Sequence, residues 1–210
     1  MSQHYKEIHF FNWLPRAEPL TDEARDRYER YFARPRDAGV VGEWTPCYMH
    51  VPGSLDLLAQ AAPRALVLVM LRDPVARYRS GVGRQRRLAR DRNQPDVAPG
   101  VLEDQLARGF YSAQVARVLE LFPRDRVLVL QYERCLANYE EERRRTYDFL
   151  GLDPEFRTPA PRFLVRGPTD RPAEPQEARL AERYAPDALA LARMLPEIDL
   201  RLWPSVAGLV

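Results

Sequence analysis

An arginine and a serine stand in a pattern suited to anion binding in the stretch VLVMLRDPVARYRSG, residues 67–81. A run of aliphatic residues, typical of a buried strand, ends at Arg72, and Pro74 is suited to the first turn of a following helix. On that helix Arg77 and Ser80 lie three positions apart and share a face. A guanidinium, a hydroxyl and a helix N-terminus together predict a site for a phosphate dianion.

The same residues allow a second interpretation on chemistry alone. Arg72 could form an ion pair with Asp73 or with another carboxylate, and such surface pairs are common and individually weak. The residues by themselves leave both interpretations open.

Strands and helices alternate along the chain, which predicts an α/β fold with a parallel sheet covered by helices. The clearest strands are at 66–71 and 127–131. Helical periodicity covers 21–33, 53–61, 75–91, 101–122, 139–150, 175–184 and 186–195. Ligands bind beyond the carboxyl ends of the strands in such sheets, and Arg72 stands at that edge.

Length and composition predict one domain over residues 1–210. The longest apolar runs are strand-sized, so we expect no membrane span and no secretory signal. Cys47 and Cys135 are far apart, and the residues around them lack metal-ligand spacing. We interpret both as reduced thiols of a cytoplasmic protein, with a disulfide as the lesser alternative.

The charges nearly balance, with 32 basic and 30 acidic residues, so the composition does not indicate a nucleic-acid partner. Lys6 is the one lysine, and the absence of a Gly-Lys pair argues against a phosphate-binding P-loop. The arginine-rich stretch 83–92 is interpreted as a solvated helix face. The alternative is a patch that attracts an acidic acceptor or nucleic acid.

The stretch that contains Arg72 and Ser80 resembles the 3′-phosphate-binding motif of the sulfotransferase family. In that family the arginine after the strand and the serine on the helix hold the 3′-phosphate of 3′-phosphoadenosine 5′-phosphosulfate (PAPS). The resemblance implies this role for Arg72 and Ser80, and a P-loop-NTPase-like sheet. It also places Arg166 and Gly167 in a late basic loop that covers the nucleotide.

The segment YKEIHFFNW, residues 5–13, resembles the Lys-Glu-x-His-Phe-Phe segment of sulfotransferases that act on carbohydrates and related acceptors. The glutamate of that segment is the family's proposed catalytic base, which implies this role for Glu7. His9 and Asn12 would line the acceptor side, and His9 could share the proton. A lone histidine between apolar residues is also often an edge residue without a chemical role.

Three further segments follow in the family's order. Residues 40–50 resemble its Gly-Glu-Lys-Thr/Ser-Pro-x-Tyr loop, with Trp44 in place of the lysine. Residues 108–152 resemble its amphipathic helix, second strand, Tyr-Glu turn and Phe-Leu-Gly-Leu ending, and 199–203 its closing tryptophan segment. The resemblance therefore spans nearly the whole chain.

The resemblance implies an enzyme that moves a sulfuryl group from PAPS to a hydroxyl or amine of a small-molecule or glycan acceptor and releases 3′,5′-ADP. We expect no metal, because this chemistry does not require one. The rival function is a degenerate, non-catalytic protein that binds a nucleotide or a partner. A nucleotide-kinase-like function is disfavoured, because no Gly-Lys-Ser/Thr motif or convincing magnesium site is present.

The family places a strand and a 5′-phosphosulfate-binding loop before the segment that residues 5–13 resemble. That loop carries a lysine and a Thr/Ser pair, and the sequence begins where this element should end. We therefore expect the first strand and loop to be missing. A sheet without that strand exposes an edge, which predicts self-association through it.

Overall fold

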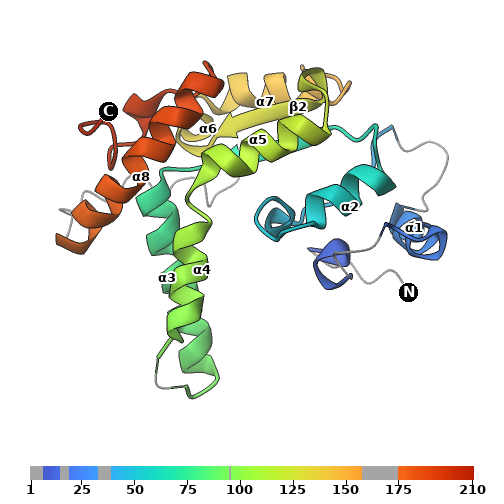
Figure 1. Cartoon of the computed structure of the whole chain (residues 1–210). Coiled ribbons are helices and arrows are strands. Elements are labelled where there is room, and N and C mark those ends of the chain that lie inside the picture. The colour runs from blue at the N-terminus through green and yellow to red at the C-terminus, as the bar shows by residue number, and fades with distance from the viewer. Residues whose placement is uncertain (1–6, 15–18, 33–38, 95, 158–174) are drawn as a thin grey trace. The chain divides into compact units, whose positions relative to one another are not determined.

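The computed structural model describes residues 7–14, 19–32, 39–94, 96–157 and 175–210. Short helical and extended elements follow one another along the chain (Figure 1). They are η1 (Phe10–Trp13), α1 (Asp22–Glu29), η2 (Arg30–Phe32), η3 (Pro46–Met49), α2 (Ser54–Ala61), β1 (Val67–Leu71), α3 (Pro74–Asp91), α4 (Pro99–Ala107), α5 (Tyr111–Leu121), η4 (Arg124–Arg126), β2 (Val127–Gln131), α6 (Tyr132–Ala137), α7 (Tyr139–Phe149), α8 (Pro175–Met194) and η6 (Leu200–Leu202).

The strands β1 and β2 are neighbours in a parallel sheet flanked by helices, so the predicted α/β class is confirmed. Within the described ranges the sheet contains these two strands. All residues of β2 are buried, whereas β1 alternates, with Val69 and Leu71 buried and Leu68 and Met70 exposed. One face of β1 is therefore uncovered by the described residues.

The chain forms two compact units. The first comprises residues 1–68, 114–128 and 147–153, and the second comprises 69–113, 129–146 and 154–210. The expectation of a single domain stays a prediction. None of the helices in the described ranges combines the length and the apolar composition needed to cross a membrane.

An aromatic cluster forms the core of the first unit. Phe11 is fully buried, and its ring centroid lies 4.6 Å from that of Tyr28 and 5.4 Å from that of Tyr48. Phe10 packs edge-on against Phe11 at 5.1 Å. Because η1 supplies both phenylalanines, this core fixes the chain directly after Glu7 and His9.

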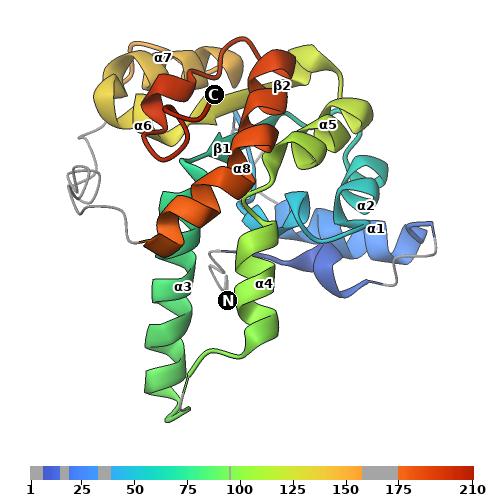
Figure 2. The ribbon, with the colours of Figure 1, turned by 60° about the vertical axis from the view of Figure 1, so that its left-hand side comes forward.

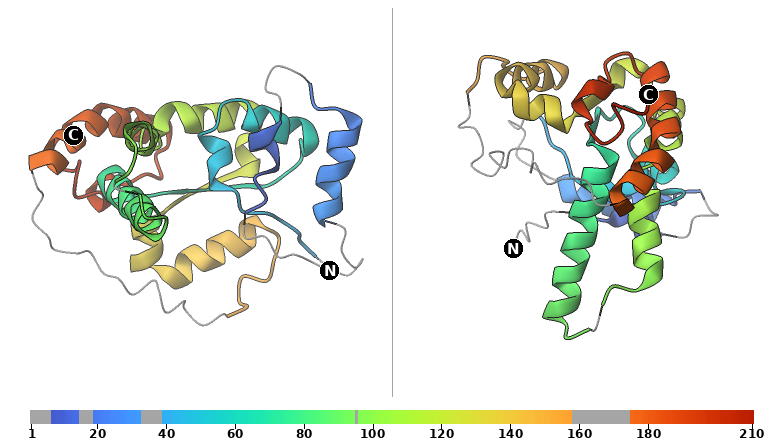
Figure 3. Two further views of the ribbon diagram at one scale, coloured as in Figure 1. Left: turned by 90° about the horizontal axis from the view of Figure 1, so that it is seen from below. Right: turned by 90° about the vertical axis from the view of Figure 1, so that its left-hand side faces the viewer.

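In the second unit α3 and α4 lie side by side, and α8 packs against α3 (Figures 2 and 3). The start of α3 is fixed by Asp73, whose Oδ1 accepts a hydrogen bond from the Ala76 amide at 2.9 Å. The same carboxylate accepts bonds from the Ser205 hydroxyl at 2.8 Å and the Ser205 amide at 3.0 Å. Asp73 is only 3% exposed, so these bonds offset the cost of burying it.

Two residues at the end of β2 bind the same C-terminal segment. Glu133 accepts hydrogen bonds from the Asp73 amide and from the Trp203 indole, both at 3.0 Å. Gln131 donates to the Asp199 carbonyl at 2.8 Å. Burial raises the pKa of Glu133 above its usual range, although its hydrogen bonds act in the opposite direction.

The predicted helix at 101–122 is wrong, because α4 and α5 are separate helices. The Tyr184 ring lies against Gly109, so close that a Cβ on this glycine would come within 2.7 Å of it. Asp187 then accepts from the Tyr111 amide at 2.6 Å and from the Ser112 amide at 3.2 Å, which caps α5. Both α8 residues are distant in sequence, so local periodicity could not reveal this break.

The predicted boundary between helices 175–184 and 186–195 is also wrong. The helix α8 continues through Pro186, and it buries Tyr184, Ala188 and Leu191 on both sides of the proline. Packing of this continuous face outweighs the loss of one backbone hydrogen bond at the proline.

We predict that Asp73→Ala lowers the free energy of unfolding by about 2–4 kcal/mol, because it removes a helix cap and several hydrogen bonds to a buried charge. Asp91→Ala, at the exposed far end of α3, is the matched control and should change it by less than about 0.5 kcal/mol. Urea denaturation of both variants tests this. Similar losses in the two variants would contradict the role of Asp73.

Candidate functional site

The predicted site residues lie in two places. Glu7 and His9 belong to the first unit, and Arg72 and Ser80 belong to the second. Arg166 and Gly167, predicted to cover a nucleotide, lie outside the described residues.

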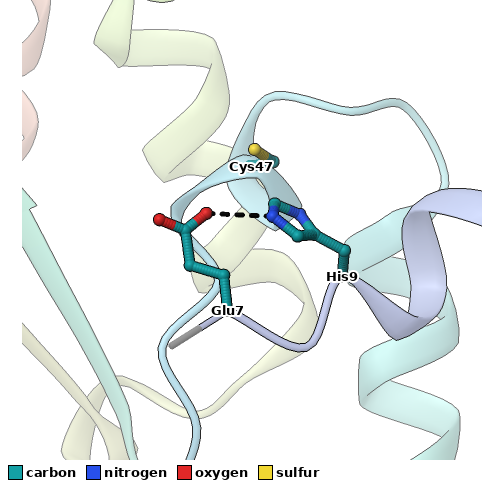
Figure 4. Close-up of side chains that lie close together, drawn as sticks. All are labelled: Glu7, His9 and Cys47. Atoms are coloured by element: carbon teal, nitrogen blue, oxygen red, sulfur yellow. Dashed lines mark ion pairs between the residues drawn. The ribbon is translucent and has the colours of Figure 1, made fainter. Parts of the chain in front are cut away.

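Glu7 and His9 are brought into direct contact just before η1 (Figure 4). The Nε2 atom of His9 lies 3.0 Å from a carboxylate oxygen of Glu7, and each side chain is about one-third exposed, at 34% and 33%. Both groups are therefore held near the surface, where a ligand can reach them. A carboxylate beside an imidazole is an arrangement able to accept and relay a proton.

The imidazole of His9 is oriented from its other side as well. Its Nδ1 lies 3.0 Å from the side-chain nitrogen of Asn12, whose oxygen accepts a hydrogen bond from Ser54 at 3.2 Å. With Asn12 as the donor, Nδ1 is the acceptor, and the neutral ring carries its hydrogen on Nε2 and donates it to Glu7. The contact with Asn12 therefore selects the tautomer that faces Glu7.

The backbone of His9 has the left-handed conformation, with φ at 55° and ψ at 21°. Such angles are uncommon for residues other than glycine and need support from their surroundings. The support here is Thr45, whose hydroxyl oxygen accepts hydrogen bonds from the Ile8 amide at 3.2 Å and the His9 amide at 3.3 Å. Thr45 thus fixes the turn that carries Glu7 and His9.

Thr45 is itself held by a partly buried acid, Glu43. Its hydroxyl donates to one carboxylate oxygen of Glu43 at 2.8 Å, and the Tyr28 hydroxyl donates to the other at 2.6 Å. Burial together with Glu43 raises the pKa of Tyr28 well above its usual range, so Tyr28 stays protonated and donates this bond. No role was predicted for Glu43 or Thr45 from the sequence. Their position in the GEWTP loop, residues 42–46, was the one feature that could have indicated a role.

A cavity of about 520 Å³ adjoins the segment that carries Glu7. Its lining includes Ile8, the aromatic rings of Phe10 and Tyr31, and the arginines Arg27 and Arg30. The guanidinium of Arg27 lies over the Phe10 ring at 5.3 Å from its centroid. The cavity therefore offers aromatic surface and positive charge.

In the second unit Arg72 directly follows β1, as predicted. Its guanidinium lies over the Tyr132 ring at 4.9 Å from the centroid, and its carbonyl accepts a hydrogen bond from the Tyr111 hydroxyl at 2.9 Å. Its Nε atom is buried, with no hydrogen-bond acceptor among the residues that the structure describes. Among the described residues, Arg72 forms no salt bridge with Asp73, which was the alternative interpretation of the sequence.

Arg77 and Ser80, predicted to share a face of α3, have different surroundings. Ser80 is exposed. Arg77 instead donates to the Gln105 carbonyl of α4, and burial lowers the pKa of its guanidinium from the usual value. Arg77 therefore links α3 to α4, and Ser80 remains the exposed hydroxyl of this helix.

Comparisons with known proteins agree with this arrangement. A model described as "Sulfotransferase family" matches residues 9–156. A solved sulfotransferase from Alicyclobacillus acidocaldarius is similar to the chain with 28% identity and a TM-score of 0.69, covering 96% of this chain and 87% of that one. The P-loop-like sheet implied by the sequence is thereby confirmed. No curated protein gave a significant match.

We predict that Thr45→Val lowers the free energy of unfolding by about 1–3 kcal/mol, because it leaves the Ile8 and His9 amides without their acceptor. Thr45→Ser keeps the hydroxyl and is the matched control. Chemical denaturation of both variants measures the difference. Equal stability of the Val and Ser variants would show that the hydroxyl does not hold this turn.

Proposed function

Because the chain belongs to the sulfotransferase family, we propose that it transfers the sulfuryl group of PAPS to a hydroxyl or amine of a small-molecule or glycan acceptor. The family and the fold support sulfuryl transfer in general. The donor, the acceptor class and the residue roles are part of the proposal.

The observation that carries the proposal is the setting of Arg72. It stands at the carboxyl end of β1, where ligands of parallel sheets bind, and its guanidinium is positioned by Tyr132 while its Nε has no described partner. An anion at this edge would supply the missing acceptor and the countercharge. In our proposal Arg72 and Ser80 hold the 3′-phosphate of PAPS, and Arg166 and Gly167 cover the nucleotide.

Glu7 is the proposed base. The acceptor oxygen or nitrogen attacks sulfur in line, its bond to sulfur forms as the bond from sulfur to the 5′-phosphate oxygen breaks, and 3′,5′-ADP leaves. The acceptor proton passes to Glu7, and His9 orients this carboxylate from 3.0 Å. The cavity beside Ile8 suits the acceptor, because it combines aromatic rings with two arginines.

Trp44 favours the non-catalytic alternative. It stands in place of a lysine of the motif and is 63% exposed, so this position supplies no positive charge to a departing phosphate. A protein of this second kind would bind 3′,5′-ADP without transferring sulfate. The predicted absence of the first strand and phosphosulfate loop stays a prediction.

The cellular location, self-association and partners of the protein are also part of the proposal. The cytoplasmic location and the interpretation of both cysteines as reduced thiols stay predictions from the sequence. The side chains of Leu66, Leu68 and Met70 are exposed, and self-association through a sheet edge stays a prediction. The predicted lack of a nucleic-acid partner also stays a prediction.

We predict that Arg72→Ala weakens the binding of 3′,5′-ADP about tenfold to hundredfold, as expected for the loss of a hydrogen bond to a charged group. Ser80→Ala should weaken it less. Arg84→Ala, an exposed arginine on the same helix, is the control and should bind as the wild type does. Titration calorimetry gives the affinities. Unchanged affinity in Arg72→Ala would refute the assignment of the 3′-phosphate site.

We predict that Glu7→Gln slows sulfuryl transfer from PAPS by about 10²–10⁴-fold, because the amide cannot take the acceptor proton. Binding of 3′,5′-ADP should remain unchanged. Glu23→Gln, an exposed glutamate of α1, is the matched control. Labelled-sulfate transfer to a panel of hydroxyl and amine acceptors measures the rates. Full activity in Glu7→Gln removes Glu7 as the base, and nucleotide binding without any transfer by the wild type supports the non-catalytic alternative.

A further inference from the structure

A third side chain with metal-binding chemistry lies beside the Glu7 and His9 pair. A carboxylate oxygen of Glu7, a ring nitrogen of His9 and the sulfur of Cys47 all lie within 4.8 Å of one another (Figure 4). Cys47 comes from η3, whereas the other two precede η1. The sequence analysis found no metal-ligand spacing around Cys47, because these ligands are contributed by two distant segments.

The separation of the Glu7 and His9 atoms is close to that of two ligands around one tetrahedral ion, and the Cys47 sulfur lies within 4.8 Å of both. Nitrogen and oxygen ligands about 2.0–2.1 Å from zinc lie about 3.3 Å apart, and a sulfur ligand lies slightly farther from each. The separation between Glu7 and His9 is 3.0 Å. A rotation of the Cys47 side chain that moves its sulfur by about an ångström would complete a set of three protein ligands. Water would provide the fourth ligand.

The backbone that presents these ligands is already fixed. Thr45 accepts hydrogen bonds from the Ile8 and His9 amides, and it lies two residues before Cys47. The Cys47 carbonyl in turn accepts a bond from the Val51 amide at 2.8 Å. One threonine thus joins the two segments, so an ion would not have to gather the ligands from a flexible chain.

Asn12 can orient His9 for a metal as well as for a proton. A metal bound to Nε2 requires the ring hydrogen to be on Nδ1. The group facing Nδ1 must then accept a hydrogen bond, whereas the Asn12 nitrogen now donates one. A half-turn of the Asn12 amide would place its oxygen against Nδ1 and its nitrogen against the Ser54 hydroxyl, which can accept. A partner of this kind behind a ligating histidine is the usual arrangement in metal sites.

We propose that Glu7, His9 and Cys47 form a binding site for a borderline-soft divalent cation, with zinc as the best match. The donor set of thiolate, imidazole and carboxylate suits zinc and disfavours magnesium and calcium, which prefer oxygen. An ion at this site coordinates the carboxylate of Glu7, which is the proposed base for the proton of the acceptor. Zinc therefore inhibits transfer, a consequence that rests on the proposed function, whereas binding itself does not.

Cobalt and zinc titrations of the full chain test the site directly. Cobalt should give a saturable thiolate-to-cobalt charge-transfer band that zinc abolishes, and zinc should raise the melting temperature. Cys47→Ser should lose the band and weaken zinc binding about 100-fold, and Asn12→Ala should weaken it about tenfold. Cys135→Ser, which removes the other thiol, should leave the band and the zinc affinity unchanged.

Several results would overturn the metal site. The band could persist in Cys47→Ser, it could vanish in Cys135→Ser, or the wild type could show no saturable binding. If Cys47→Ser unfolds, as seen by circular dichroism, Cys47→Ala and His9→Ala provide the same comparison, with His50→Ala as the histidine control.

The inhibition has its own test. Zinc should suppress sulfuryl transfer by the wild type, and Cys47→Ser should keep its activity at the same zinc concentration. Equal inhibition of both proteins would refute the link between this site and catalysis. Metal binding without any sulfuryl transfer would support the metal site and count against the proposed function. Sulfuryl transfer without metal binding would support the proposed function and refute the metal site.

Discussion

The fold of the second unit depends on polar residues at the carboxyl ends of the two strands, which bind one C-terminal segment. Asp73 follows β1 and binds Ser205, while Glu133 follows β2 and binds Trp203. Glu133 also accepts from the Asp73 amide, so the two strand ends are joined to each other. Asp73 is buried and Glu133 is partly buried, so removing their hydrogen-bond partners would be costly, and their bonds fix the backbone on one side of Arg72. The Tyr111 hydroxyl bound to the Arg72 carbonyl fixes it again. The backbone of Arg72, the residue proposed to bind an anion, is thus preorganised by other side chains of the second unit.

The first unit follows the same physical rule in another form. A partly buried acid, Glu43, accepts hydrogen bonds from Tyr28 and Thr45, and Thr45 then holds the amides of the turn before η1. The turn includes His9 in a left-handed conformation that a histidine adopts only with support. In both units a carboxylate with fully used oxygens positions the residue proposed to do chemistry. Breaking either network should therefore reduce function through geometry and leave the reacting side chain intact.

Local sequence patterns were sufficient for the strands and for most helix starts. Aliphatic runs marked β1 and β2, and Pro74 marked the start of α3. They failed where a distant side chain decides the local structure, as at Gly109, where Tyr184 and Asp187 of α8 separate α4 from α5. The candidate site shows the same division. The family resemblance singled out Glu7 and His9, but Thr45 and Cys47 join them only through the folded chain.

The pair of Glu7 and His9 cannot serve proton transfer and metal binding in the same tautomeric state. Proton transfer needs a carboxylate with an open oxygen and a neutral imidazole that donates to it, which is the tautomer selected by the present orientation of Asn12. Metal binding needs the opposite tautomer and both groups as ligands. Without Cys47 the pair would offer an ion two ligands and little affinity, so the base would be free in the presence of trace metal. With a thiol within 4.8 Å of both, a third ligand is at hand, and the fixed turn that would make Glu7 a well-placed base also makes it a well-placed ligand. Under the proposed function, sensitivity to zinc would thus follow from the preorganisation of the proposed base, whatever the acceptor.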